Sequence, residues 1–261
     1  MNFRYIGAKM MAVRALVNHG ELISLMPANR FQFDGVADLL AIVPSQVDYL
    51  IESSDMVSRV RNVIIGGAPL DNDRRKRILD AGLNAYATYG MTETASHVAL
   101  AHVGEDYYHA LPGITFSSDN RDCLVIDMEG RDTSHIVTND IVRIISQDTF
   151  KWIGRYDNVI NSGGIKIVPE EIESVVRVVL EREGIAFSEL IIVPRPSEKW
   201  GLEAVCLLET ERDYCQDTLE YLRNAIKHSI DNPLKCPKEI ICVRQLARTP
   251  SGKLDRNNSL R

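Results

Sequence analysis

The first hundred residues alternate between short apolar runs and segments with helical spacing, and this alternation limits the folds open to the chain. The helical segments carry apolar residues three or four positions apart, whereas the strand-like runs are short and end at turn residues. A strand–helix–strand–helix order is typical of an α/β protein with a partly parallel sheet. We expect helices over residues 10–17, 34–40, 45–51 and 71–81, and strands over residues 21–25, 62–65 and 85–88.

The pattern changes twice further along the chain. Short strand-like runs over residues 123–127, 141–145 and 149–153 lie between polar turns, which predicts a small antiparallel β region. After residue 157, two amphipathic helices alternate with three strands, as in a compact α+β domain. We therefore expect two domains, residues 1–155 and residues 156–261. The charged face of the helix at 71–81 is predicted to be solvated.

Composition excludes several classes of function. The 261 residues are 45% hydrophobic, 25% are charged, and the net charge is -6. No basic patch dominates, which disfavours nucleic acid as a partner. No apolar run approaches the roughly 20 residues of a membrane span, and residues 1–5 do not begin a signal peptide. The five cysteines form no C-x-x-C pair, so we expect buried reduced thiols in a cytoplasmic protein.

The strongest chemical signal is Tyr89-Gly90-Met91-Thr92-Glu93, which directly follows a predicted strand. Glycine permits close backbone approach, hydroxyl and N–H groups hold phosphate, and a carboxylate holds Mg²⁺. A strand followed by a Gly–Thr turn is also common for purely structural reasons. As a string, however, the segment closely resembles the YGxTE motif of the adenylate-forming family, which includes acyl-CoA synthetases, luciferases and peptide-synthetase adenylation domains.

Further resemblances follow in the family's order along the chain. Gly66-Gly67-Ala68-Pro69 is similar to the segment beside adenine, and Thr138-Asn139-Asp140 resembles the family's TGD, with Asn139 in place of glycine. Asparagine tolerates glycine-like backbone angles. Residues 154–158 and 161–173 match the signature at the inter-domain hinge, and residues 249–256 resemble the terminal motif with its lysine. The fold implied is the C-terminal part of the family's α/β N-terminal domain, a mixed sheet with helices plus a small β region, followed by a small α+β C-terminal domain.

The resemblance implies ATP, Mg²⁺ and coenzyme A as cofactor or co-substrates, and it implies a role for each matched residue. Lys253, Thr92 and Glu93 would be catalytic, with Glu93 also the Mg²⁺ ligand. Asp157 would be the hinge. The residues implied in nucleotide or CoA binding are Gly66, Gly67, Ala68, Tyr89, Gly90, Met91, Thr92, Asp140, Arg155, Gly163 and Gly164.

Each implied role has a structural alternative. Lys253 is also readable as a surface lysine in a turn, Asp140 as a turn residue, and Arg155 as a surface ion-pair partner. Gly163 and Gly164 are also readable as a plain turn. The sequence alone leaves these alternatives open.

One family element has no counterpart: the Gly-, Ser- and Thr-rich loop that holds the β- and γ-phosphates of ATP. It normally precedes the region matched by residues 5–25, so we expect the chain to begin inside the N-terminal domain and to be inactive alone. Residues 5–16 are most similar to short o-succinylbenzoate–CoA ligases of menaquinone biosynthesis. In that reading Lys9 or Arg14 would reach substrate carboxylates, although a surface cation on a helix is the alternative for either.

The expected activity is that of an ATP-dependent, AMP-forming acid–thiol ligase. Its partners would be a carboxylic acid, ATP and CoA, with a homodimer as one possible assembly. The alternatives are another aryl- or acyl-CoA ligase, a ligase that loads a carrier protein, and a remnant that binds nucleotide without turnover. The sequence does not name the acid.

Overall fold

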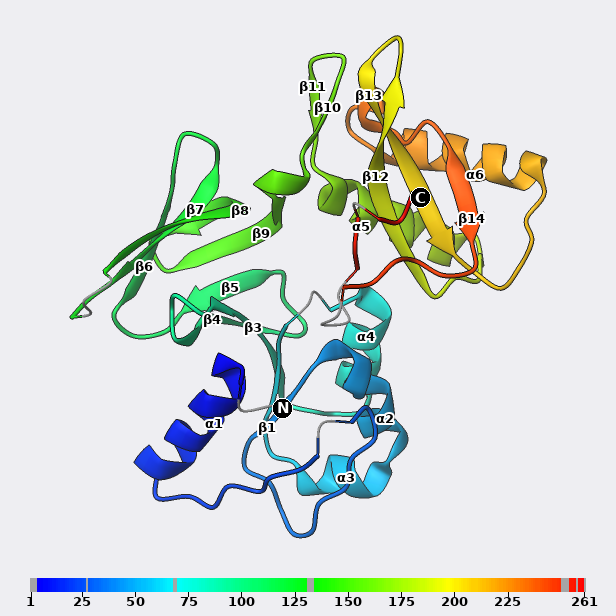
Figure 1. Ribbon diagram of the computed structural model, residues 1–261. Helices are drawn as coiled ribbons and strands as arrows, with labels where there is room; N and C mark the ends of the chain where they lie inside the picture. Colours follow the sequence, from blue (N-terminus) through cyan, green and yellow to red (C-terminus); the bar gives the residue numbers. More distant parts are fainter. Residues whose placement is uncertain are drawn as a thin grey trace. The chain divides into compact units, whose positions relative to one another are not determined.

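The computed structural model describes residues 4–26, 28–67, 70–130, 134–249, 254–256 and 258–260. The chain divides into two compact units, shown in Figure 1. The first comprises residues 1–138 and 143–152, and the second comprises residues 139–142 and 153–261. Each is described here by itself.

The first unit begins its sheet with three parallel strands. In β1, β2 and β3 the register places Ile42 opposite Ile65 and Ile65 opposite Ala87. These strands are apolar on both sides, as expected where helices cover a parallel sheet. The bounds are Leu40–Ile42 for β1, Val63–Ile65 for β2 and Ala85–Met91 for β3.

The predicted β region continues this sheet instead of forming a separate one. Nine strands follow the order β1-β2-β3-β4-β5-β9-β8-β7-β6, with antiparallel pairing from β3 to β4, β4 to β5 and β5 to β9. The added strands are β4 (Ser96–His102), β5 (Tyr107–Ala110), β6 (Ile114–Ser118), β7 (Cys123–Met128), β8 (His135–Ser146) and β9 (Thr149–Arg155).

Helices of the first unit start where the sequence supplies caps. The Ser53 hydroxyl accepts a hydrogen bond from the Met56 N–H, and the Asp71 carboxylate accepts one from the Arg74 N–H at 2.8 Å. Such caps satisfy backbone donors that the first helical turn leaves without partners. The helices are α1 (Ile6–Val17), η1 (Pro44–Gln46), α2 (Val47–Glu52), α3 (Ser54–Arg59) and α4 (Asn72–Asp80).

Two predicted elements are wrong. Residues 21–25 form no strand, because no neighbouring strand pairs with them within the described residues. Residues 34–40 form no helix: Ala37 makes a parallel bridge to Val60, and the chain then enters β1. Strands β4 and β5 were not predicted, because β4 contains two alanines, which are depleted in strands, and β5 is only four residues long.

The charged face of α4 also differs from the prediction of a solvated surface. Arg74 makes ion pairs with Asp48 at 3.0 Å and Asp71 at 2.5 Å, and Arg77 contacts Asp48 at 2.6 Å. These contacts join α4 to α2. The arginine run thus fastens one helix to another, at partly exposed positions where each ion pair contributes at most about 1 kcal/mol.

The second unit is built on a five-stranded sheet. Strand β13 pairs antiparallel with β12 along its whole length, with β10 at Gly201, and parallel with β14 over residues 206–209. Strands β10 and β11 form a hairpin. The elements are η2 (Tyr156–Asn158), β10 (Ile160–Ser162), β11 (Ile165–Ile167), α5 (Pro169–Arg182), β12 (Glu189–Ser197), β13 (Gly201–Glu209), α6 (Gln216–Ser229), η3 (Pro233–Lys235) and β14 (Ile240–Val243).

The two faces of this sheet are covered by different parts of the chain. Helix α5 starts at Pro169 and buries Ile172, Val176 and Leu180 at helical spacing, and with α6 it covers one face. On the opposite face Leu246 packs with Ile191, and Leu254 joins the same cluster. The C-terminal segment therefore serves as the second cover of the sheet.

No helix in the described part of the chain is both long and apolar enough to cross a membrane.

Candidate functional site

The carboxyl ends of β2 and β3 bring two predicted nucleotide-binding segments together. Gly66 and Gly67 directly follow β2, and Tyr89 lies near the end of β3, two residues beyond the Ala87–Ile65 pair. Carboxyl ends of neighbouring parallel strands are where α/β proteins bind ligands. Ala68, predicted to contact the nucleotide, lies outside the described residues.

Gly90 is required by a close approach of two strands. The motif does not start in a turn after the strand, as predicted, because Tyr89, Gly90 and Met91 are the last residues of β3. A β-bulge separates Tyr89 from Gly90, and a Cβ on Gly90 would lie 2.1 Å from the Ser96 carbonyl oxygen on β4. Any larger residue would push β4 away.

The turn after Gly90 presents Thr92 and Glu93 to solvent. Its geometry is set by Thr94, which is 2% exposed and whose hydroxyl accepts from the Met91 N–H at 2.9 Å and lies 2.6 Å from the Ser96 carbonyl. Sequence reasoning gave Thr94 no role, although a threonine two residues after Thr92 closes the turn like a cap. Thr92 and Glu93 stand at its exposed tip.

The donor set for a cation at this turn is small. Glu93 supplies one exposed carboxylate, and no group of three His, Cys, Asp or Glu side chains in the described residues is arranged to hold a metal ion. Mg²⁺ commonly binds through one or two carboxylates together with substrate phosphates and water. Glu93 therefore fits a Mg²⁺ ion that arrives with a nucleotide, not an ion held by protein alone.

In the second unit, Arg155 joins two predicted site residues. Its guanidinium lies 3.3 Å from the Asp140 carboxylate and 3.0 Å from the Asp157 carboxylate, and Asn139 donates to Asp157 at 3.1 Å. Burial alone would lower the pKa of Arg155, but the Asp140 and Asp157 charges outweigh it and raise that pKa. Asp140 is only 6% exposed, whereas Asp157 is exposed. Structure thus brings the predicted ribose ligand, nucleotide contact and hinge residue into one cluster.

Gly163 and Gly164 form the two-residue turn of the β10–β11 hairpin. Both have positive φ, +56° and +85°, which two-residue hairpin turns require and which glycine adopts without strain. A Cβ on Gly163 would lie 2.5 Å from the Trp200 ring, whereas one on Gly164 would meet nothing within 4 Å. The Gly163 N–H also donates to the Trp200 carbonyl at 3.0 Å. Trp200, missed in the sequence, therefore forms a wall beside this turn.

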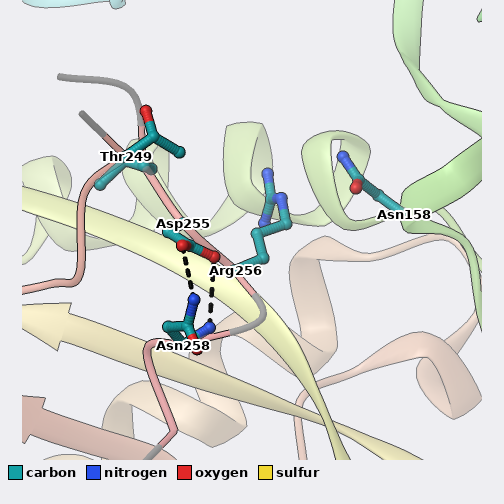
Figure 2. A pocket seen from close by; sticks show the side chains of 6 residues that line it. Asn158, Thr249, Asp255, Arg256 and Asn258 are labelled. Atoms are coloured by element: carbon teal, nitrogen blue, oxygen red, sulfur yellow. Dashed lines mark hydrogen bonds between the residues drawn. The ribbon is translucent and has the colours of Figure 1, made fainter. Parts of the chain in front are cut away.

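Lys253 lies outside the described residues, but the chain on both sides of it lines a hollow in the second unit (Figure 2). Its volume is about 450 Å³. Thr249 comes from one side of the gap, and Leu254, Asp255, Arg256 and Asn158 complete the lining together with Asn258. The Asp255 carboxylate accepts two hydrogen bonds from Asn258, shown as dashed lines.

A second feature missed in the sequence is a contact between Arg14 on α1 and His97 on β4. The Arg14 guanidinium lies 3.2 Å from Nδ1 and 3.4 Å from Nε2 of His97. Burial and the Arg14 charge lower the pKa of His97 to about 4, and burial lowers the pKa of Arg14. No carboxylate in the described ranges pairs with Arg14, whereas Lys9 is exposed. The pair lies 83 residues apart in the chain, so no local pattern reveals it.

Comparisons with known proteins show the family of the chain. The AMP-binding enzyme family matches residues 19–138. A solved structure of an acyl-CoA synthetase (AMP-forming)/AMP-acid ligase II-like protein from Dyadobacter fermentans is 32% identical, with a TM-score of 0.57, and the match covers 100% of this chain and 76% of that one. The chain belongs to the AMP-binding enzyme family. This is the adenylate-forming family that the motifs indicated.

Curated relatives of this AMP-binding enzyme include 2-succinylbenzoate–CoA ligases. The protein of that name from Listeria monocytogenes is 26% identical over 246 residues, which are 85% of this chain and 51% of the relative. The one from Haemophilus influenzae is 27% identical over 206 residues, 70% of this chain and 44% of the relative. The chain therefore spans about half the length of the curated relatives it matches.

Proposed function

We propose that this AMP-binding enzyme is an acid–CoA ligase that forms AMP. In the first half-reaction, a carboxylate oxygen attacks the α-phosphorus of ATP, the α–β phosphoanhydride bond breaks, and pyrophosphate leaves. In the second, the CoA thiolate attacks the acyl carbon, and AMP leaves with the electron pair of the acyl–phosphate bond. The observation that carries the proposal is the buried Asp140 carboxylate held by Arg155, at the residue that matches the family's ribose-binding Asp in sequence.

Residue roles follow from chemistry that the described contacts support. Asp140 would accept hydrogen bonds from the two ribose hydroxyls, and Arg155 would keep it ionised and oriented while contacting the nucleotide. Gly66, Gly67 and the Tyr89–Met91 backbone would line the base. Thr92 and Glu93 would face the phosphates, where Mg²⁺ held by Glu93 would neutralise phosphate charge. Lys253 would bridge the carboxylate and the α-phosphate.

The acid we propose is o-succinylbenzoate, which carries a second carboxylate. Arg14 is a half-buried cation that contacts a neutral imidazole, an arrangement that an anion would complete. The names of the Listeria and Haemophilus relatives support this choice of acid. A straight-chain fatty acid offers no second anion for Arg14.

Coenzyme A would approach along the Gly163–Gly164 turn. Exposed glycines let a narrow pantetheine arm pass beside the backbone. The Lys199 ammonium lies 4.8 Å and the Lys238 ammonium 5.7 Å from the centre of the Trp200 ring beside this turn. An aromatic face flanked by two cations suits a phosphorylated nucleotide such as the head of CoA. Rotation about Asp157 would exchange Lys253 for this turn between the half-reactions.

Two variants test which residue serves adenylation and which serves thioester formation. Lys253→Ala, made in a complete enzyme, should slow adenylation, measured by pyrophosphate exchange, about 100-fold, the scale for one lost transition-state cation of roughly 3 kcal/mol. It should leave thioester formation from preformed adenylate unchanged. Gly164→Leu should show the opposite pattern. Equal damage to both half-reactions in both variants would contradict the proposal.

The choice of acid is tested by binding. Arg14→Gln should weaken a non-reactive mimic of the o-succinylbenzoyl adenylate about 10- to 100-fold, because one charge-assisted contact is lost. A benzoyl adenylate mimic, which lacks the second carboxylate, should bind as before. Arg61→Gln, at an arginine whose side chain is 70% exposed, is the control. If Arg14→Gln weakened both mimics equally, a diacid substrate would lose its support.

A further inference from the structure

Arg256 is the most buried arginine with two carboxylate partners in the second unit's described residues. Its side chain is 18% exposed, and it pairs with Glu173, 13% exposed, and Glu170, 10% exposed. The guanidinium donates to both Glu173 oxygens, the second at 2.9 Å, to Glu170 at 3.3 Å and to the Ile192 carbonyl at 2.9 Å. Burial acts to lower the pKa of Arg256, but the charges of Glu173 and Glu170 outweigh it and raise that pKa.

These contacts fasten the C-terminal segment to helix α5 and strand β12. Glu170 and Glu173 lie one turn apart at the start of α5, so both carboxylates face the same side. Glu173 also accepts from the Ile192 N–H at 2.6 Å. A buried charge network in which every partner is bonded holds its members in one geometry.

Backbone contacts between residues 247–248 and 254–255 also hold the two sides of the C-terminal segment together; we call these residues the base of the segment. Arg248 and Leu254 form an antiparallel bridge, and the Asp255 N–H donates to the Ala247 carbonyl at 2.8 Å. Leu254 and Leu246 pack in the apolar cluster on the sheet. Lys253 is covalently adjacent to this closed base.

Glu170 also contacts residues beside the predicted hinge residue, Asp157. Glu170 accepts from Asn158 at 2.5 Å, and the Arg155 N–H points to it at 3.4 Å. Gly154 makes room, since a Cβ there would lie 2.6 Å from the Glu170 carboxylate. Glu170 thus joins the residues beside Asp157 to the residues beside Lys253.

We propose that Arg256, with Glu170 and Glu173, is a positioning residue that fixes where the adenylation lysine stands. The network ties Asn158, which follows the predicted hinge, through helix α5 to the base at 254–256, so that these parts move as one piece. This inference rests on the proposed function of Lys253. It predicts that loosening Arg256 damages the half-reaction that uses the lysine and spares the other.

Arg256→Lys tests this without leaving the two glutamates unpaired. Lysine keeps the charge but cannot make the forked contacts to Glu173, Glu170 and the Ile192 carbonyl at once. The matched control is Arg195→Lys, because Arg195 also pairs with two carboxylates, Glu203 at 2.7 Å and Glu239 at 2.5 Å, and forms no ion pair with the described residues of the C-terminal segment. Both variants should fold, which urea unfolding checks.

We expect Arg256→Lys, made in a complete enzyme, to lower kcat for pyrophosphate exchange about 10- to 100-fold, the cost of a misplaced catalytic group. The KM for ATP and the rate of thioester formation from preformed adenylate should stay within about twofold. Amide hydrogen exchange at Asp255 should accelerate at least about tenfold. Arg195→Lys should change none of these quantities.

The outcomes separate this inference from the function on which it rests. If Lys253→Ala slows pyrophosphate exchange and Arg256→Lys does not, the positioning role is wrong and the proposed function stands. Equal slowing of both half-reactions in Arg256→Lys would also overturn it, because a purely structural residue gives that pattern. If Lys253→Ala leaves pyrophosphate exchange intact, the proposed function fails and the inference falls with it.

Discussion

Single residues of this chain show how burial without a counter-ion shapes a binding site. Arg14 and His97 share a half-buried environment in which the imidazole stays neutral because its burial and, to a smaller extent, the guanidinium 3.2 Å away lower its pKa. Arg256 and Arg155, by contrast, are neutralised by carboxylates. The first arrangement suits an incoming anion, whereas the second fixes protein parts in place.

The lowered pKa of His97 has a measurable effect on stability. The unfolded chain takes up this proton near pH 6.5, whereas the folded chain takes it up only near pH 4. Unfolding therefore binds a proton within this window, so the free energy of unfolding should fall as the pH drops from about 6.5 to about 4.

His97→Gln should reduce this fall, because glutamine does not titrate. Urea unfolding at pH 7 and pH 4.5 measures the difference for each protein. His135→Gln is the control, since the His135 side chain is 61% exposed and pairs with Asp127. A pH dependence that His97→Gln left as steep as in the wild type would show that the imidazole is not held neutral.

At the scale of elements, the β10–β11 hairpin offers two glycines that differ in one respect. Gly163 faces Trp200 and Gly164 faces open space, while both have positive φ. Alanine at either position costs about 1 to 2 kcal/mol for the left-handed backbone. Gly163→Ala should cost about 1 to 3 kcal/mol more, because its Cβ must displace the Trp200 ring.

Urea unfolding of the two alanine variants gives the comparison directly. Trp200 fluorescence reports whether the ring has moved, with Trp152 present in both variants as a constant background. Equal destabilisation by Gly163→Ala and Gly164→Ala would mean that the Trp200 ring does not wall this turn.

Elements with long periodic patterns could be predicted from the sequence, and so could a short, wholly apolar strand such as β2, whereas several other short elements could not. Helices α5 and α6 and strands β12 to β14 follow from apolar spacing over four or more residues. The strands of β10 and β11 have three residues each, too few for a pattern. Residues 21–25 read as a strand, but a strand needs a neighbour, which local sequence does not reveal.

Some residues of the candidate site could likewise be predicted from the sequence, and others could not. Motif strings located Tyr89 to Glu93, Asp140 and Arg155, and the structure adds their contacts. Thr94 and Glu170 lie within or beside those strings but were given no role, although turn and capping chemistry could have found them. Arg14 with His97 depends on packing between segments far apart in the chain, which only the fold supplies.

At the scale of the whole molecule, the chain has separate cores. One cluster lies among β1, β2 and the helices α2 to α4, and another lies between α5, α6 and their sheet. Because each of these clusters lies within one unit, we predict two calorimetric transitions. Val63→Ala should lower one and Leu222→Ala the other, with Leu222→Ala costing about 2 to 5 kcal/mol.

Scanning calorimetry of the two variants, at matched concentration, measures both shifts. Each buried side chain is at most 1% exposed, so each should report on its own core alone. A single transition that both substitutions lower together would contradict two independently folded units.

The central claim is that Asp140 recognises the ribose of a bound nucleotide, and a comparison of two ligands tests it most directly. The wild-type chain, titrated by calorimetry, should bind AMP about 10- to 100-fold more tightly than 2′,3′-dideoxy-AMP, since hydrogen bonds to a charged group contribute about 1.5 to 3 kcal/mol. Asp140→Ala should bind both ligands alike. Asp157→Ala, which removes the other carboxylate on Arg155, should keep the preference. Equal affinities in the wild type, or a preference that survives in Asp140→Ala, would contradict the account.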